Sequence, residues 1–272
     1  MIELQRVSKT FPNEETGQVV QALESIDLTV EESEFVCLLG PSGCGKSTLL
    51  NLVAGFEEPT HGRILFDGAP VRAAGPERGV VFQEPALFPW LNVAQNVEFG
   101  LRNMDVAVSV RKETVRRFVS LVGLSEFSRA RPHQLSGGMK QRVQLARVLA
   151  LNPRALLMDE PFGALDAQTR DRLQDELLSI WERDRKTVLF VTHNVEEAVY
   201  LADRVVVLAP APDGISADVP ISMPRPRERF SDDMRDATTA LLRVLADLPC
   251  CVLPSPGTGE TLAREPSITL PG

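Results

Sequence analysis

A glycine-rich turn between an apolar run and a helical pattern constrains this chain more than any other feature of its sequence. Residues 40–48 read GPSGCGKST, the apolar run 35–39 (FVCLL) precedes them, and the helical pattern 49–54 (LLNLVA) follows. Three glycines allow the backbone to wrap so that consecutive N–H groups point into one concavity. The positive end of the helix dipole adds to this concavity. The stretch therefore predicts a polyphosphate site, and nucleotide binding is our first hypothesis.

The composition excludes several classes of protein. The 272 residues suffice for one large domain or for one domain with an appendage, and 43 % hydrophobic residues can form a substantial core. A formal net charge of −8 argues against a nucleic-acid partner, which normally requires a basic face. Neither a signal-peptide pattern nor a run of about 18 apolar residues occurs, so we expect a chain that is not exported and does not span a membrane. Four cysteines without a CxxC pair fit a reducing cytoplasm.

Strand patterns alternate with helical patterns along the chain. Alternating apolar and polar residues over 2–7 and 25–30 predict strands of a sheet that lies against the nucleotide core, and 62–68 reads as a short strand ended by a turn. Apolar runs predict further strands at residues 79–82, 155–159, 187–192 and 204–208. Strands that alternate with helices in this way indicate an α/β fold with a mostly parallel sheet.

Two parts of the chain depart from this alternation. Helical spacing at about residues 85–152 predicts a helical insertion within a domain that covers residues 1–230. Beyond Pro210 the periodicity is lost, until Ser231 offers an N-cap for a helix over 231–248. Residues 249–272 contain five prolines and few apolar residues, which is typical of a disordered tail.

Two carboxylates, Asp159 and Glu160, end one of the predicted strands. This position puts them at the C-terminal edge of a parallel sheet, where the glycine-rich turn also opens. We predict that Asp159 and the hydroxyl of Ser47 hold Mg²⁺, that Lys46 reaches the β- and γ-phosphates, and that Thr48 lies near the α-phosphate. Glu160 would act as general base on the attacking water, a role that typically contributes about 10²–10⁴-fold.

A second glycine pair opens a helical stretch within the insertion. Residues 135–142 read LSGGMKQR, with Ser136 as the natural N-cap. The two glycines allow close backbone approach, and the N–H groups of the first helical turn form a second anion site. Read alone, such a sequence is usually only a helix cap. Its position on a separate helical segment, ahead of the Asp159 carboxylate, favours a functional role.

These motifs, in this order, resemble those of the ATP-binding-cassette (ABC) ATPases over about residues 1–230. The stretch LSGGM stands where that family has its signature, and Gln83 matches the glutamine that senses the γ-phosphate. Residues 163–166 (GALD) resemble the loop that touches the partner subunit, and His193 matches the switch histidine. Phe11 falls where an aromatic ring stacks on adenine in this family.

The resemblance implies a set of site residues. Met139 replaces a more frequent glutamine and Phe11 a commoner tyrosine, and neither change removes a group that hydrolysis requires. The catalytic residues would be Glu160, His193, Gln83 and Lys46. The Mg²⁺ ligands would be Ser47, Gln83 and Asp159. The residues that bind ATP would be Phe11, Gly40, Pro41, Ser42, Gly43, Cys44, Gly45, Lys46, Ser47, Thr48, Ser136, Gly137, Gly138 and Asp166.

The resemblance also implies a fold and an activity. The expected fold is that of a P-loop NTPase: a RecA-like core with a mostly parallel sheet, an N-terminal antiparallel β-subdomain and a helical signature subdomain. With ATP and Mg²⁺ as cofactors, ATP binding would close a head-to-tail pair of cassettes and hydrolysis would reopen it. The pair would be a homodimer or two different cassettes.

A membrane permease is the partner that the family implies. The aromatic stretch 85–91 (PALFPWL) stands where the family docks the permease, although an internal contact between subdomains is the other interpretation. The chain would then be peripheral, on the cytoplasmic face of the bacterial inner membrane, and an extracytoplasmic solute-binding protein would be an indirect partner. Several stretches, including 223–227 (MPRPR), look most like nitrate, sulfonate and taurine importers. The same five residues also fit a solvated linker.

A soluble ABC ATPase with a non-transport partner is the main alternative. Chromosome-maintenance ATPases place a long coiled coil between these motifs, and the interval from Lys46 to Asp159 has no sustained heptads. A ribosome-acting protein would carry two cassettes, a regulatory module would typically lack Glu160, and a small-molecule kinase would not need the signature. Nitrate, taurine, alkanesulfonates and pyrimidine precursors are all compatible solutes, because the permease and the binding protein select the substrate.

Overall fold

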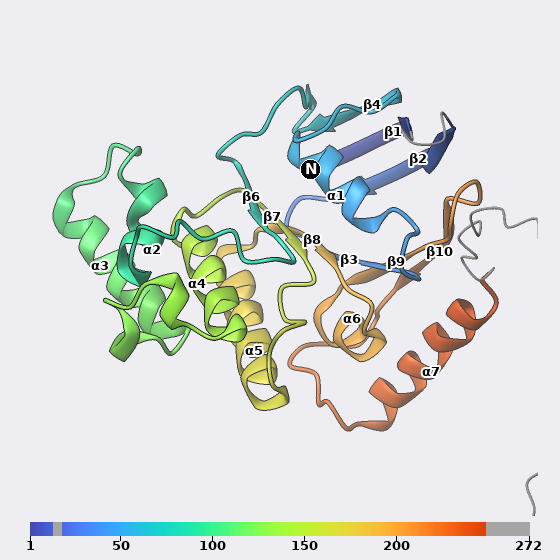
Figure 1. Cartoon of the computed structure of the whole chain (residues 1–272). Helices are drawn as coiled ribbons and strands as arrows, with labels where there is room; N and C mark the ends of the chain where they lie inside the picture. The colour runs from blue at the N-terminus through green and yellow to red at the C-terminus, as the bar shows by residue number, and fades with distance from the viewer. Residues whose placement is uncertain (13–17, 249–272) are drawn as a thin grey trace, which may run out of the picture.

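Two β-sheets and a set of α-helices make up the fold (Figure 1). The computed structural model describes residues 1–12 and 18–248. The disordered tail predicted at 249–272 lies outside the described residues.

Seven α-helices occur in the described residues. They are α1 Lys46–Ala54, α2 Val93–Leu101, α3 Val108–Leu121, α4 Gly137–Ala150, α5 Ala167–Asp184, α6 Val195–Leu201 and α7 Asp232–Ala246. Helices α2, α3 and α4 form a group of their own on one side of the larger sheet, at the left of Figure 1. This group is the predicted helical subdomain. None of the helices in the described part of the chain has both the length and the apolar character needed to cross a bilayer.

The larger sheet contains six strands, ordered β10, β9, β3, β8, β7 and β6. Their bounds are β3 Phe35–Leu39, β6 Arg78–Val81, β7 Ala155–Asp159, β8 Thr187–Val191, β9 Arg204–Leu208 and β10 Ile215–Pro220. Five strands pair in parallel, which confirms the α/β prediction, and β10 pairs with β9 antiparallel at one edge. Strand β10 is not among the predicted strands: it is a short edge strand that ends at Pro220 and in which partly buried Ile215, Ala217 and Val219 alternate with exposed residues.

Strand β3 separates two hydrophobic cores. Phe35, Cys37 and Leu39 belong to a core shared with α4, α5 and α6. Val36 and Leu38 belong to a second core, shared with α1 and the smaller sheet. Alternate residues of a strand point to opposite faces, so a strand covered on both faces needs an uninterrupted apolar run. The run that precedes the glycine-rich turn therefore holds this turn at the centre of the molecule.

The smaller sheet has the order β2, β1, β4, β5 and is antiparallel throughout. Its strands are β1 Ile2–Pro12, β2 Val19–Val30, β4 His61–Phe66 and β5 Ala69–Pro70. It lies at the top right of Figure 1, beside α1, and its inward residues complete the second core. This sheet confirms the antiparallel β-subdomain. The strands β1 and β2 are longer than their alternating patterns predict.

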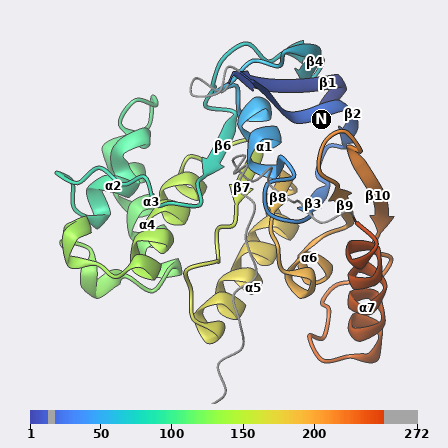
Figure 2. The same cartoon turned by 45° about the vertical axis from the view of Figure 1, so that its right-hand side comes forward.

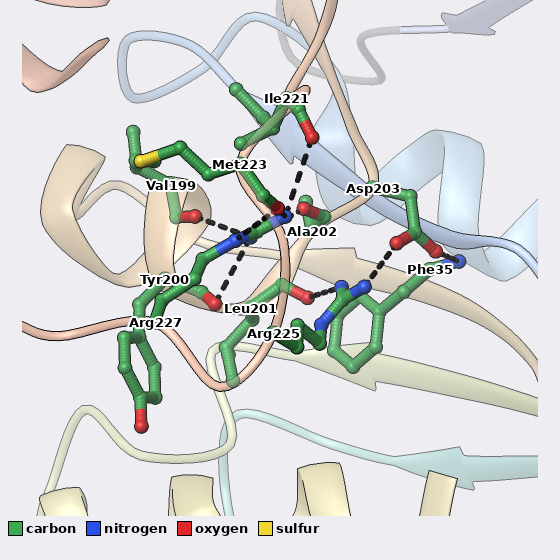
Figure 3. Close-up of polar contacts among 10 residues, drawn as sticks. All are labelled: Phe35, Val199, Tyr200, Leu201, Ala202, Asp203, Ile221, Met223, Arg225 and Arg227. Carbon is green, nitrogen blue, oxygen red and sulfur yellow. Dashed lines mark hydrogen bonds and ion pairs between the residues drawn. The ribbon is translucent and has the colours of Figure 1, made fainter. Parts of the chain in front are cut away.

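The segment that follows β10 is fixed against α6, so its interpretation as a solvated linker is wrong. Arg225 pairs with Asp203 and donates to the carbonyl of Leu201 at 2.5 Å (Figure 3). Arg227 is only 7 % exposed and donates to five main-chain carbonyls, those of Val199, Tyr200, Ala202, Ile221 and Met223. Helix α7 then begins after its predicted N-cap Ser231 and packs beside α6 (Figure 2).

Candidate nucleotide-binding site

The glycine-rich turn joins β3 to α1 in the predicted way. Gly43 and Gly45 have φ angles of +82° and +98°, in the left-handed region that favours glycine. A Cβ atom on Gly45 would lie 2.6 Å from the carbonyl oxygen of Ala22. The turn is thus held against β2, and only glycine fits at its last position.

A cavity of about 270 Å³ opens over this turn. It is lined by Ala22, Ser42, Gly43, Gly45, Lys46, Ser47, Thr48, Gln83 and Glu160. Gln83 follows β6 and Glu160 follows β7, so the carboxyl ends of three parallel strands meet at this cavity. Ala22 is the one lining residue that sequence reasoning missed. A small residue in an outer strand gives no sequence signal, and its place becomes visible only through its contact with Gly45.

Lys46 is folded back onto the turn. Its Nζ donates to the carbonyl oxygens of Gly40 and Pro41, at 2.8 Å each, and the residue is 7 % exposed. The ammonium group is therefore positioned by the turn itself. Cys44 is buried in the second core, which agrees with its interpretation as a small filler. Gly40, Pro41 and Cys44 do not line the cavity and contribute to the turn behind it.

Asp159 and Ser47 form a pair that fits a hard divalent cation. Burial raises the pKa of Asp159, Glu160 raises it further, and a hydrogen bond from the Ser47 hydroxyl lowers it. Oδ1 of Asp159 is buried and has no hydrogen-bond partner among the described residues. Mg²⁺ prefers such oxygen ligands and usually takes only one or two carboxylates, with phosphate and water completing its shell. No cluster of three His, Cys, Asp or Glu residues suited to a metal occurs in residues 1–12 and 18–248.

Two predicted residues, His193 and Gln83, converge on the carboxylate of Glu160. Nδ1 of His193 lies 3.0 Å from its Oε2, and Nε2 of Gln83 lies 3.5 Å from the same atom. Glu160 has a φ of +44°, unusual for a residue other than glycine, and its N–H donates to the carbonyl of Val191. The arrangement can accept a proton from a water molecule held between the carboxylate and the phosphate-binding turn.

The signature residues lie elsewhere in the same chain. Ser136 caps α4 and accepts from the N–H of Met139 at 3.2 Å. A Cβ atom on Gly137 would meet no atom within 4 Å, and one on Gly138 would lie 3.3 Å from the carbonyl of Ala164. The signature therefore contacts the 163–166 loop and leaves one face open. None of its residues lines the cavity over the glycine-rich turn.

Two other predicted residues also lie outside this cavity. Phe11 is on β1, with Nζ of Lys9 4.8 Å above its ring. Asp166 caps α5 by accepting from the N–H of Thr169 at 2.9 Å, and these hydrogen bonds lower the pKa of its carboxyl. The structure thus brings together the turn, Gln83 and Glu160 at one cavity, and Phe11, the signature and Asp166 do not line it.

Comparison with known proteins agrees with this geometry. A family model described as ABC transporter matches residues 23–163. This chain belongs to the ABC transporter family. The cassette is 47 % identical over 236 residues to the nitrate import ATP-binding protein NrtD of Synechococcus elongatus, covering 85 % of each chain. It is 51 % identical to the taurine import ATP-binding protein TauB of Pseudomonas putida, covering 78 % of this chain and 79 % of that one.

Solved structures place the cassette in the same fold. A dimeric ATP-binding cassette in a post-hydrolysis state, bound to ADP and Pi, superposes with a TM-score of 0.74 at 32 % identity. The match covers 82 % of this chain and all of the other. The cassette is also 50 % identical to an uncharacterized ABC transporter ATP-binding protein of Methanocaldococcus jannaschii, over 90 % of this chain and 91 % of that one. These matches confirm the P-loop NTPase fold and ATP as the ligand class.

Proposed function

We propose that this cassette hydrolyses ATP–Mg²⁺ and, in a pair, drives a separate permease that imports nitrate, sulfonate, taurine or a similar small solute. The convergence of Gln83 and His193 on the Glu160 carboxylate carries the proposal. A carboxylate held at the open end of a phosphate-binding turn supplies the base that phosphoryl transfer to water requires. The printed names of NrtD and TauB support import as the coupled process.

Each group at the turn has a separate task in this proposal. The phosphates bind to the N–H groups of residues 42–48 and to the ammonium group of Lys46. For Lys46 they compete with the carbonyl oxygens of Gly40 and Pro41, to which its Nζ donates in this structure. Ser47, Asp159 and Gln83 would hold Mg²⁺, which neutralises charge on the transferred phosphate. Glu160 accepts the proton of the attacking water, and His193 fixes the orientation of this carboxylate.

The open signature supports a paired cassette. Ser136, Gly137 and Gly138 lie outside the cavity of their own chain, and we infer that they complete the site of a second cassette. A head-to-tail pair with two-fold symmetry satisfies both sites with the same surfaces. Phe11 would stack on adenine, and Asp166 and its loop would face the partner. The second cassette would be an identical chain or a different one.

An aromatic patch next to Gln83 supports permease docking. It consists of Phe88, Trp90 and Phe99, whose rings lie 5.5 Å (Phe88 to Trp90) and 4.2 Å (Phe88 to Phe99) apart. Trp90 is 65 % exposed, and exposed aromatic rings of this kind are enriched at protein interfaces. The buried Asn96 side chain holds the patch in place by bonding both the N–H of Phe88 and the carbonyl of Leu91.

The patch is linked to the hydrolytic site through α4. Gln144 donates to the carbonyl of Phe82 and accepts from the N–H of Ala86, at 2.7 Å in both cases. The residues on either side of Gln83 are thereby tied to the helix that begins with the signature. Movement of Gln83 or of the signature at the start of α4 would therefore be transmitted to a permease helix bound on the patch. The exposure of Trp90 favours docking over a purely internal contact for the aromatic stretch.

One purification tests the proposal. We would purify the tagged Glu160→Gln chain from gently solubilised membranes with ATP–Mg²⁺, beside a Glu182→Gln control that removes an exposed carboxylate of α5. We expect a multi-spanning membrane protein to co-purify with the Glu160→Gln chain, at one copy per cassette. We also expect the cassette itself to be found at the cytoplasmic face of the membrane. Recovery of soluble proteins or nucleic acid alone would reject import and favour an ABC ATPase with a non-transport partner.

A further inference from the structure

Helix α6 begins immediately after the residues that hold His193. The N–H of Asn194 donates to Oγ1 of Thr192 at 3.0 Å, and the Asn194 side chain accepts from the N–H of Glu197 at 3.1 Å. His193 therefore lies between two neighbours whose positions depend on α6. With seven residues, α6 is too short to be stable without tertiary contacts. Whatever fixes α6 also fixes His193.

A buried chain of hydrogen bonds connects this helix to the segment after β10. The carboxylate of Glu197, 8 % exposed, accepts from Oγ1 of Thr192 at 2.5 Å and from Nε2 of Gln174 at 2.8 Å. Oε1 of Gln174 in turn accepts from Nη1 of Arg229 at 2.6 Å. Burial raises the pKa of Glu197, and the two hydrogen bonds lower it. Successive hydrogen bonds therefore link Thr192, Glu197, Gln174 and Arg229 in that order.

Arg229 makes further contacts that fix its own position. Its guanidinium lies 3.6 Å from the ring centroid of Tyr200, and Nη2 donates to Oδ1 of Asp175 at 2.7 Å. The hydroxyl of Tyr200 donates to the same carboxylate oxygen, also at 2.7 Å. Two residues earlier, Arg227 donates to the last carbonyls of α6 (Figure 3). The segment 227–229 thus contacts α6 at its C-terminal end and, through Gln174, near its start.

We propose that the segment 227–229 sets the position of His193, with Arg229, Gln174 and Glu197 as positioning residues for hydrolysis. The inference rests on the proposed function in one respect, that His193 acts in hydrolysis. The segment lies outside residues 23–163, which the family model matches. The network also lines a cavity of about 260 Å³ that Gln174, Glu197 and Arg229 share. Arg229 is the partly exposed end of this buried polar network, with 22 % of its side chain exposed, so it can be substituted without opening a hydrophobic core.

Substitution of Arg229 tests this role. In Arg229→Met the amide of Gln174 loses its donor and becomes free to turn away from Glu197. We expect kcat for ATP to fall by about ten- to a hundredfold, the size of loss that a small misplacement of a catalytic group causes, with KM changed less than twofold. Arg229→Lys keeps the charge beside Asp175 without the planar fork, and its loss should be smaller. Arg235→Met is the matched control, because Arg235 lies on α7 and, among residues 1–12 and 18–248, pairs only with the exposed Asp232.

Imidazole NMR separates this inference from the proposed function. The chain has three histidines, so the His193 signals are assigned by comparison with His193→Ala. We expect Arg229→Met and Arg229→Lys to shift these signals and Arg235→Met to leave them in place. Unchanged signals together with unchanged kcat in both Arg229 variants would overturn the inference and leave the ATPase proposal intact. A wild-type chain without ATPase activity would reject the proposed function, and the NMR shifts would still decide the positioning.

Discussion

Nδ1 of His193 lies 3.0 Å from Oε2 of Glu160, although the two residues follow different strands, β8 and β7. The contact joins the predicted base to a side chain that approaches it from β8, while Gln83 approaches the same oxygen from the β6 side at 3.5 Å. Because both side chains contact Oε2, the Glu160 carboxylate is restricted in rotation while its other oxygen is left out of these contacts. Orientation of this kind affects the rate of the chemical step more than the affinity for the ground state.

We expect His193→Ala to lower kcat by about 10²-fold and to leave the affinity for ATP within a few fold, because the Glu160 carboxylate is still present and loses only the contact that orients it. Steady-state hydrolysis and equilibrium binding of ATP measure the two quantities. His61→Ala removes an exposed imidazole from β4 and should change neither. A variant of His193 whose rate stays at the wild-type level would contradict the assignment.

Gly45 is the position in the turn at which a side chain should cost most. In Gly45→Ala the φ of +98° costs about 1–3 kcal/mol of strain, and the new Cβ atom would lie 2.6 Å from the carbonyl of Ala22. We expect at least a tenfold loss of ATP affinity in a titration. Gly68→Ala is the control: Gly68 has a φ of +77° and no atom within 4 Å of the added Cβ. It should lose stability by about 1–2 kcal/mol without losing affinity. Equal losses of ATP affinity in Gly45→Ala and Gly68→Ala would show that the contact between Gly45 and Ala22 is not what preserves the phosphate-binding turn.

Arg227 contributes to stability through the carbonyls it satisfies. Burial lowers its pKa to about 10, so the guanidinium remains protonated at neutral pH. Removal of the side chain leaves five main-chain carbonyls without this donor, and we expect Arg227→Met to lose about 3–5 kcal/mol in urea unfolding. The exposed Arg235→Met should lose less than about 1 kcal/mol. A loss as small as that of the control would show that the carbonyls find other partners.

The sequence predicts those parts of the site that depend on local spacing. The glycine-rich turn, the carboxylates after β7 and the histidine after β8 each stand at the end of an apolar run, so the order of strands and turns is enough to place them at one edge of a parallel sheet. Their individual roles stay predictions.

Contacts between distant residues leave no such pattern. Arg229 and Gln174 are 55 positions apart, and Ala22 contacts the turn only because β2 packs over it. Composition alone also misleads at 223–227: prolines and arginines are typical of a solvated linker, yet here the arginines are bound to carbonyls at the end of α6. Every residue has a main-chain carbonyl, so the sequence does not show which carbonyls at the end of α6 need a hydrogen-bond donor from an arginine side chain. The structure shows which ones do.

The separation of the signature from the cavity of its own chain leads to a complementation experiment. Lys46→Ala disables the phosphate-binding turn, and Gly137→Asp places a charged side chain at a position with no neighbour within 4 Å, where it blocks bound nucleotide without disturbing the fold. Each variant alone should be inactive.

If the signature acts on the second cassette of a homodimer, a mixed dimer contains one intact site, formed by the turn of the Gly137→Asp chain and the signature of the Lys46→Ala chain. Equimolar mixing in ATP–Mg²⁺ should then restore about a quarter of the wild-type rate, because half of the dimers are mixed and each has one working site of two. A mixture as inactive as its components would reject the identical pair and point to a different second cassette.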